Sequence, residues 1–229
     1  TITISRAAGA TNDLETLSLS SNSAANTVAT ITTDDVDTAA VEITGDQNLT
    51  VTSALGNEIL TVTSTAFTGD LTLTGGTGDT TYTLGSGADS ITASTGDDTI
   101  TAGAGADEIT LGTGSDSVSG GAGADTIIET SGGLTSADTI SGGDGADTLS
   151  ISDASTVVDA DFTSITSVET LTQGATNGAQ TITLGSLADA SGLTTVTGNG
   201  TGVDTLTVGA GFDNALTVNV ATGNDKIDA

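Results

Sequence analysis

The chain lacks several residue types on which common functional sites depend. Its 229 residues include no cysteine, histidine, methionine, tryptophan or proline, and only two of them are basic, Arg6 and Lys226. Because thiolates and imidazoles are absent, zinc, haem and iron–sulfur sites of the usual kind are excluded. Ser-His-Asp and Cys-His catalytic arrangements are excluded for the same reason. The lack of cysteine also means that disulfides do not stabilise this chain.

The charge of the chain is strongly one-sided. Thirty acidic residues give a formal net charge of −28, and aromatic residues make up only 2% of the sequence. Such a chain can neither neutralise a phosphate backbone nor stack bases, so we expect no nucleic-acid partner. The charge also excludes docking on anionic lipid through a basic patch, and no apolar run approaches the roughly 20 residues that span a membrane. We therefore expect no membrane insertion.

The residues that are abundant favour strands over helices. A core must be built from Val, Ile, Leu and Ala, with Thr and Ser supplying much of the rest, and 32 glycines are spread along the chain. Small β-branched side chains suit narrow, pleated interiors better than a globule filled with large side chains. No segment of ten residues shows a helical stripe of apolar positions.

A nine-residue repeat runs through residues 85–127, GSGADSITASTGDDTITAGAGADEITLGTGSDSVSGGAGADTI. Each unit has an aspartate, a glycine two residues before it and an aliphatic residue two residues after it. The aspartates of these units are Asp89, Asp98, Asp107, Asp116 and Asp125, and the aliphatic residues are Ile91, Ile100, Ile109, Val118 and Ile127. A flexible Gly/Asp-rich linker is the alternative interpretation, but a linker has no reason to place an aliphatic residue at every ninth position.

The repeat extends in both directions from this segment. Residues 75–83 keep the frame, with Tyr82 at the apolar position and Thr80 in place of the aspartate. After a four-residue insertion at 129–132, the spacing resumes with Asp138 and Asp147. A second, looser array near the end of the chain contains Asp204, Asp213 and Asp225.

The unit x-G-x-G-x-D-x-(Ile/Val)-x resembles the RTX nonapeptide G-G-x-G-x-D-x-U-x, a signature of calcium-binding β-helices. The aliphatic residue of each unit lies in a short strand, and Gly-x-Gly-x-Asp forms a tight turn. Two consecutive units then make one flattened coil. We predict an all-β fold, a right-handed parallel β-helix or β-roll solenoid with calcium-binding turns.

This geometry stacks the aspartates of alternate units. Asp89, Asp107 and Asp125 are expected along one edge, and Asp98 and Asp116 along the other. Stacked carboxylates need a cation between them, and Ca²⁺ takes about 6–8 oxygens from carboxylates and carbonyls. We therefore predict multiple Ca²⁺ ions between adjacent turns. The candidate ligands are Asp89, Asp98, Asp107, Asp116, Asp125, Asp138, Asp147, Asp204, Asp213 and Asp225.

Four segments follow from these patterns. Residues 1–74 and 151–198 are interpreted as β-helical flanks, residues 75–150 as an RTX β-roll array, and residues 199–229 as the start of a second array. The phrase LETLS at 14–18 matches VETLT at 168–172, which supports this flank–array–flank–array order. We expect one continuous solenoid with few calcium sites in the flanks, against the alternative that a flank forms a separate small β-sandwich, and we expect the chain to be part of a longer protein.

The chain also resembles RTX-containing bacterial surface-layer proteins, through its nonapeptides and its Thr/Ser/Ala/Gly-rich flanks. The resemblance implies a non-enzymatic, secreted, cell-surface scaffold that folds on calcium binding and self-associates into a lattice, sheath or filament, with cell-surface polysaccharide as a candidate partner. An RTX adhesin spacer is the first alternative. A calcium-dependent ice-binding solenoid is the second, because Thr77, Thr95 and Thr113 recur at the same place in every second nonapeptide.

Overall fold

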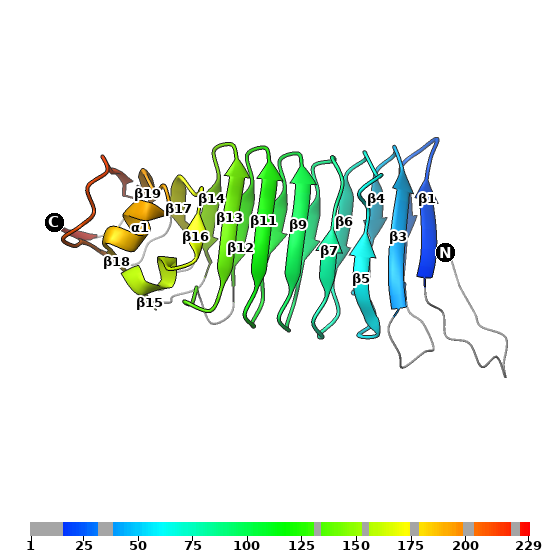
Figure 1. Ribbon diagram of the computed structural model, residues 1–229, viewed down its shortest axis with the longest axis horizontal. Helices are drawn as coiled ribbons and strands as arrows, with labels where there is room; N and C mark the ends of the chain where they lie inside the picture. The colour runs from blue at the N-terminus through cyan, green and yellow to red at the C-terminus, as the bar shows by residue number, and fades with distance from the viewer. Residues whose placement is uncertain are drawn as a thin grey trace.

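The chain forms a solenoid of parallel β-strands stacked along one axis (Figure 1). A computed structural model describes residues 16–31, 39–130, 134–152, 156–174, 179–198, 204–220 and 225–229. Every strand pair within these residues is parallel, and from β1 to β14 successive strands alternate between two facing sheets. The predicted all-β parallel solenoid is therefore confirmed.

Two long sheets run along the solenoid, and neighbours within each sheet are one coil apart. Within the described residues, the first sheet has eight strands: β1 (Thr16–Ser21), β3 (Ala39–Gly45), β5 (Ile59–Thr63), β7 (Thr81–Thr83), β9 (Thr99–Ala104), β11 (Ser117–Ala122), β13 (Thr139–Asp144) and β16 (Ile165–Thr166). The second has ten: β2 (Asn26–Val28), β4 (Leu49–Val51), β6 (Leu71–Thr74), β8 (Ser90–Thr92), β10 (Glu108–Thr110), β12 (Thr126–Glu129), β14 (Thr148–Ile151), β17 (Thr170–Gln173), β19 (Thr195–Thr197) and β21 (Thr217–Asn219).

A third, shorter sheet lies at the C-terminal end. In the described part of the chain it has four strands: β15 (Thr156–Val157), β18 (Thr181–Leu184), β20 (Thr205–Val208) and β22 (Lys226–Asp228). The first sheet ends at β16, whereas the second continues through β17, β19 and β21. From β18 onward, the third sheet therefore supplies the strands that alternate along the chain with those of the second sheet.

Strand register shows how the coils differ in length. Thr72 pairs with Ser90 and Ser90 with Glu108, so each of these array coils consists of two nonapeptides, as the repeat predicts. Thr126 pairs with Thr148, and the coil between them is longer because it contains the four-residue insertion. The coils of the flanks are also longer than two nonapeptides, as the pairing of Val41 with Val62 shows.

A thin aliphatic core lies between the facing sheets. Ile91, Ile109 and Ile127 are adjacent in the second sheet and are at most 1% exposed, as the inward face of each strand requires. The alternating residues on the outer face are mostly Thr and Ser. The β-branched inward side chains pack well on a pleated surface, which accounts for short strands forming stable ladders.

Two short helices occur within the described residues, where the sequence shows no helical stripe. A 3₁₀-helix spans Asp159–Phe162, and α1 spans Ser186–Ala190. The Oδ1 atom of Asp159 accepts the backbone N–H groups of Gly185 at 2.8 Å and Ala188 at 2.9 Å, so a residue one coil away caps α1. A single turn capped at long range has too few residues to produce a helical periodicity. None of the described helices is long and apolar enough to cross a membrane.

Replacing a central core residue should weaken the whole stack. We expect Ile109→Ala to lower the free energy of unfolding in calcium by about 2–4 kcal/mol, because it leaves a cavity between Ile91 and Ile127. Denaturant unfolding measures this change. The control is Thr110→Ala on the outer face of β10, which should cost less than about 1 kcal/mol. Equal losses would contradict the inward and outward assignment.

Candidate metal centre

Aspartates of alternate repeats meet at one edge of the second sheet. Asp89, Asp107, Asp125 and Asp147 directly precede β8, β10, β12 and β14, and parallel stacking brings them into line. The backbone N–H of each donates to Oδ1 of the next, at 2.7 Å from Asp89, 2.9 Å from Asp107 and 2.8 Å from Asp125. We call these four residues the first carboxylate row.

The remaining repeats form a second row at the other edge. Asp98, Asp116 and Asp138 precede β9, β11 and β13 in the first sheet. The N–H of Asp98 donates to Oδ1 of Asp116 at 2.8 Å, and that of Asp116 to Oδ1 of Asp138 at 3.0 Å. The predicted division of alternate aspartates between two edges agrees with this geometry.

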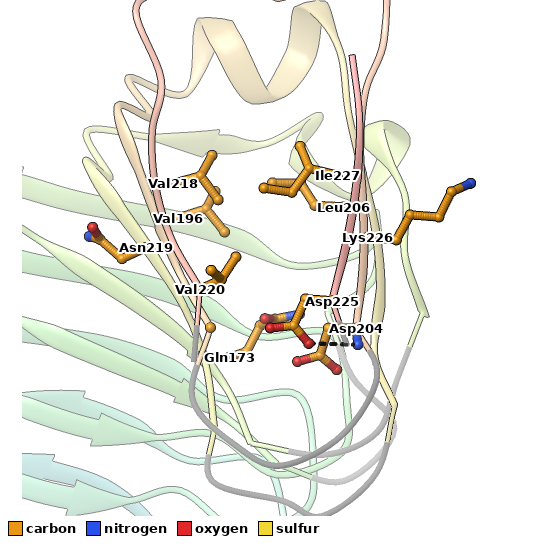
Figure 2. Close-up of a pocket in the computed structure, with 11 residues that line it drawn as sticks. Gln173, Val196, Asp204, Leu206, Val218, Asn219, Val220, Asp225, Lys226 and Ile227 are labelled. Carbon is orange, nitrogen blue, oxygen red and sulfur yellow. Dashed lines mark hydrogen bonds between the residues drawn. The ribbon is translucent and has the colours of Figure 1, made fainter. Parts of the chain in front are cut away.

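Only two of the three candidate aspartates of the second array lie together. The N–H of Asp204 donates to Oδ1 of Asp225 at 3.2 Å. Figure 2 shows both carboxylates in a pocket with the apolar Val218 and Ile227. Asp213, by contrast, is exposed, and its N–H donates to Asp189 at 3.1 Å. Asp213 therefore belongs to neither row.

The two oxygens of each row carboxylate lie in different environments. Oδ1 accepts the N–H of the preceding coil, whereas Oδ2 is buried and, among the described residues, accepts no hydrogen bond in Asp89, Asp98, Asp107, Asp125 and Asp147. Asp138 differs, because its Oδ2 accepts the N–H and the hydroxyl of Thr135, both at 3.0 Å. A buried carboxylate oxygen with no partner is costly, so each of the five is a position where a cation would stabilise the fold.

Burial and crowding shift the acidity of these groups. Burial raises the pKa of Asp89 and of Asp98 to about 7, and that of Asp107 to about 6, and neighbouring carboxylates add to the rise in all three. Backbone hydrogen bonds oppose the rise without cancelling it. Burial likewise raises the pKa of Asp116, Asp125 and Asp147. The rows thus hold carboxylates whose ionised form is unfavourable without a nearby positive charge.

Glycine is required in the turns because successive turns touch through their backbones. Gly103 has φ +104°, and a Cβ there would clash with the carbonyl oxygen of Gly85 in the preceding coil. A side chain would therefore be strained by conformation and blocked by the turn below. Removing side chains from this edge leaves backbone carbonyls facing the space between the turns.

Near Gly120, a carbonyl and a carboxylate converge. The point where a Cβ of Gly120 would lie is 2.5 Å from the carbonyl oxygen of Gly142 and is also in contact with Oδ2 of Asp125. These oxygens come from neighbouring coils. This is the donor set that Ca²⁺ prefers, a carboxylate with backbone carbonyls.

The rows therefore fit calcium through mixed donors. No group of three or more carboxylates within the described residues is placed to hold a metal ion by itself. Turn carbonyls must supply much of the shell, as the glycine-lined edges allow. All ten candidate ligands stay predictions. Five of them have a second oxygen that accepts no hydrogen bond from the described residues, namely Asp89, Asp98, Asp107, Asp125 and Asp147.

Two features of these edges escape the nonapeptide pattern. Glu169 extends the first row by one coil, since its Oε2 accepts the N–H of Asp147 at 2.8 Å. The phrase VETL, with an acid directly before a strand, is the signal that could have indicated it. Asp97, which lies outside the ligand position of the repeat, is exposed and accepts the N–H of Ser115 at 2.8 Å.

The threonine rank considered for ice binding is only partly regular. Thr77, Thr95 and Thr113 are exposed, and the hydroxyl of Thr95 donates to the carbonyl of Thr77 at 3.0 Å. The adjacent rank contains Asp97 and Ser115, so the surface beside the threonines is not uniform.

A parallel β-solenoid with glycine and aspartate turns every nine residues defines a class of calcium-binding repeat proteins. The family model of the RTX calcium-binding nonapeptide repeat (4 copies) matches residues 74–109, 83–118, 103–128 and 133–150. Residues 74–128 and 133–150 of the chain therefore carry RTX calcium-binding nonapeptide repeats. Comparison with curated proteins and with solved structures gave no match.

A methyl group at a stacked turn should disturb the array. We expect Gly103→Ala to lower the free energy of unfolding in calcium by about 2 kcal/mol or more, since φ +104° strains alanine and the Cβ meets the Gly85 carbonyl. The exposed Ala106→Gly, in the same turn, is the control and should cost less than about 1 kcal/mol. Equal stability of Gly103→Ala and the wild type would contradict the close approach of the turns.

Calcium-depleted protein should be more structured in mild acid than in mild alkali. The folded pKa of Asp89 and of Asp98, about 7, lies above the ordinary value of 3.8, so protonation favours the folded state. This stabilisation grows as pH falls from about 7 towards 4 and is lost as pH rises through about 7. Circular dichroism at pH 5 and pH 8 measures it. The double variant Asp89→Asn/Asp98→Asn should show a smaller difference, and more strand at pH 8 than at pH 5 in the wild type would refute the expectation.

Proposed function

We propose that this protein is a calcium-binding extracellular structural protein, a subunit of a bacterial surface layer, sheath or filament. The observation that carries the proposal is the row of buried Oδ2 atoms without hydrogen-bond partners among the described residues, repeated on successive coils beside the carbonyls of glycine turns. Multiple Ca²⁺ ions bound along both edges would neutralise these oxygens and fasten each coil to the next.

The charge of the chain supports folding that depends on calcium. A net charge of −28 on a thin solenoid strongly disfavours the compact state, because like charges are stacked at its edges. Ions that bind only the folded state stabilise it by mass action. Where calcium is scarce, as inside a cell, the chain stays unfolded and suited to export. Abundant calcium outside would then fold it.

The shape of the molecule supports a structural role. The coils stack into a rod (Figure 1). Its outer faces carry hydroxyl side chains, since Thr72, Thr126 and Thr148 alternate with buried residues in their strands. The two carboxylate rows lie where the turns meet the strands. Flat faces between charged edges suit side-by-side packing of rods, and calcium can bridge acidic edges of neighbouring copies.

Substituting one row carboxylate should damage two neighbouring ion sites. Asp107 lies between Asp89 and Asp125, so Asp107→Asn should bind up to two fewer Ca²⁺ ions and raise the calcium concentration needed for folding. The amide can still accept the N–H of Asp89. Equilibrium dialysis counts the ions, and circular dichroism follows the folding.

The matched control for this experiment is Glu108→Gln. It removes the same charge from the next residue, which is exposed on the outer face of β10. It should leave both the ion count and the folding midpoint unchanged. Identical behaviour of the two variants, or a wild-type β-spectrum that persists after calcium removal, would argue against calcium-dependent folding. Electron microscopy with and without calcium then separates a lattice or filament subunit from an adhesin spacer, which would stay dispersed.

A further inference from the structure

The first carboxylate row continues past the last matched repeat. Glu169 directly precedes β17, as Asp147 precedes β14, and the two strands are neighbours in register. The N–H of Asp147 donates to Oε2 of Glu169, just as the N–H of Asp125 donates to Oδ1 of Asp147. Glu169 lies outside the residues that match the nonapeptide model. A glutamate of the flank thus takes the place of the next aspartate.

The backbone carbonyl that lies beside a row carboxylate in the array also has a counterpart at Glu169. In the array, a Cβ on Gly120 would meet both Oδ2 of Asp125 and the carbonyl oxygen of Gly142. One coil later, a Cβ on Gly142 would lie 2.5 Å from Oδ2 of Asp147 and would clash with the carbonyl oxygen of Ser167. Ser167 therefore presents its carbonyl where Gly142 does in the coil before.

Ser167 achieves this without being a glycine. Its φ of +53° lies in the left-handed region, which non-glycine residues adopt uncommonly. Gly142 has no positive φ, so the two turns present their carbonyls with different backbone conformations, and the sequence SITSVETL contains no glycine. The nonapeptide pattern has no means of detecting it.

An unsatisfied oxygen points into this space. Asp147 is 0% exposed, and its Oδ2 accepts no hydrogen bond among the described residues. It lies beside Gly142 on the side that the Ser167 carbonyl occupies. The half-buried carboxylate of Glu169 is adjacent, with Oε2 engaged by the N–H of Asp147.

We propose that Asp147, Glu169 and the carbonyl of Ser167 form a Ca²⁺ site outside the nonapeptide array. Two carboxylates and a carbonyl are hard oxygen donors of the kind that calcium selects. This ion fastens the first coil of the second flank to the array, so calcium controls the junction as well as the repeats. The site rests on the proposed calcium binding of the array, whose geometry it copies.

The variant Glu169→Gln tests this site. The amide oxygen can still accept the N–H of Asp147, whereas the negative charge that calcium needs is lost. Ions are counted in the full chain by equilibrium dialysis with Ca²⁺ alone. We expect Glu169→Gln to bind one ion fewer than the wild type and Glu108→Gln to bind the same number. An unchanged count and affinity in Glu169→Gln would overturn the proposal, leaving Glu169 as an N–H acceptor only.

A second variant, Glu169→Asp, keeps the test decisive if Glu169→Gln does not fold. Glu169→Asp retains a carboxylate. If Glu169→Asp folds and binds the full number of ions whereas Glu169→Gln does not fold, the result supports Ca²⁺ binding by the carboxylate at this position. Failure of both variants to fold would assign Glu169 a structural role and reject the site. The array is judged separately by Asp107→Asn. If that variant loses ions and Glu169→Gln does not, only the junction site fails; if the wild type binds no Ca²⁺, the function proposed above fails as well.

Discussion

Each coil of the array is tied to its neighbour by a carboxylate that uses one oxygen and leaves the other unsatisfied. The Oδ1 atom of Asp107 accepts the N–H of Asp89, and its Oδ2 is buried without a hydrogen bond from the described residues. Because parallel strands lie only about 4.8 Å apart, every such carboxylate also faces another of the same charge. The hydrogen bonds set the stacking, and the second oxygens create the need for a cation. The glycine turns, the acidic composition and the thin core are all compatible with this single constraint.

That constraint links folding to the ion. A core of Ile, Val and Leu in strands of a few residues buries modest apolar area per coil, and it must offset a net charge of −28. Calcium converts the repulsive edges into the sites that join coils. A solenoid built in this way is approximately one-dimensional, so each coil depends on its neighbours, and a row carboxylate lost at one turn weakens the interfaces with both neighbouring coils.

The flanks stabilise their coils by different means. The array coils consist of two nonapeptides, whereas Leu171 pairs with Val196 across a longer coil of the second flank. A longer coil encloses more cross-section, and the fully buried Phe67 and Phe162 help to fill it. In the second flank, the Asp159 carboxylate that caps α1 accepts backbone N–H groups and so adds side-chain-to-backbone hydrogen bonds between coils. Apolar volume and capping thus take over part of the stabilisation that ions would provide in the array.

The sequence by itself determined the coil of two nonapeptides, the parallel sheets and the division of aspartates between two edges, because a strict nine-residue period makes contacts between coils predictable. The tertiary structure alone decided that Glu169 joins the first row, that Asp213 joins none and that Ser167 stands in for a glycine. Coils of the flanks vary in length, so residues that meet there have no constant separation. The register of each pair is then settled by core packing and by the local turn, and no periodic signal in the sequence records it.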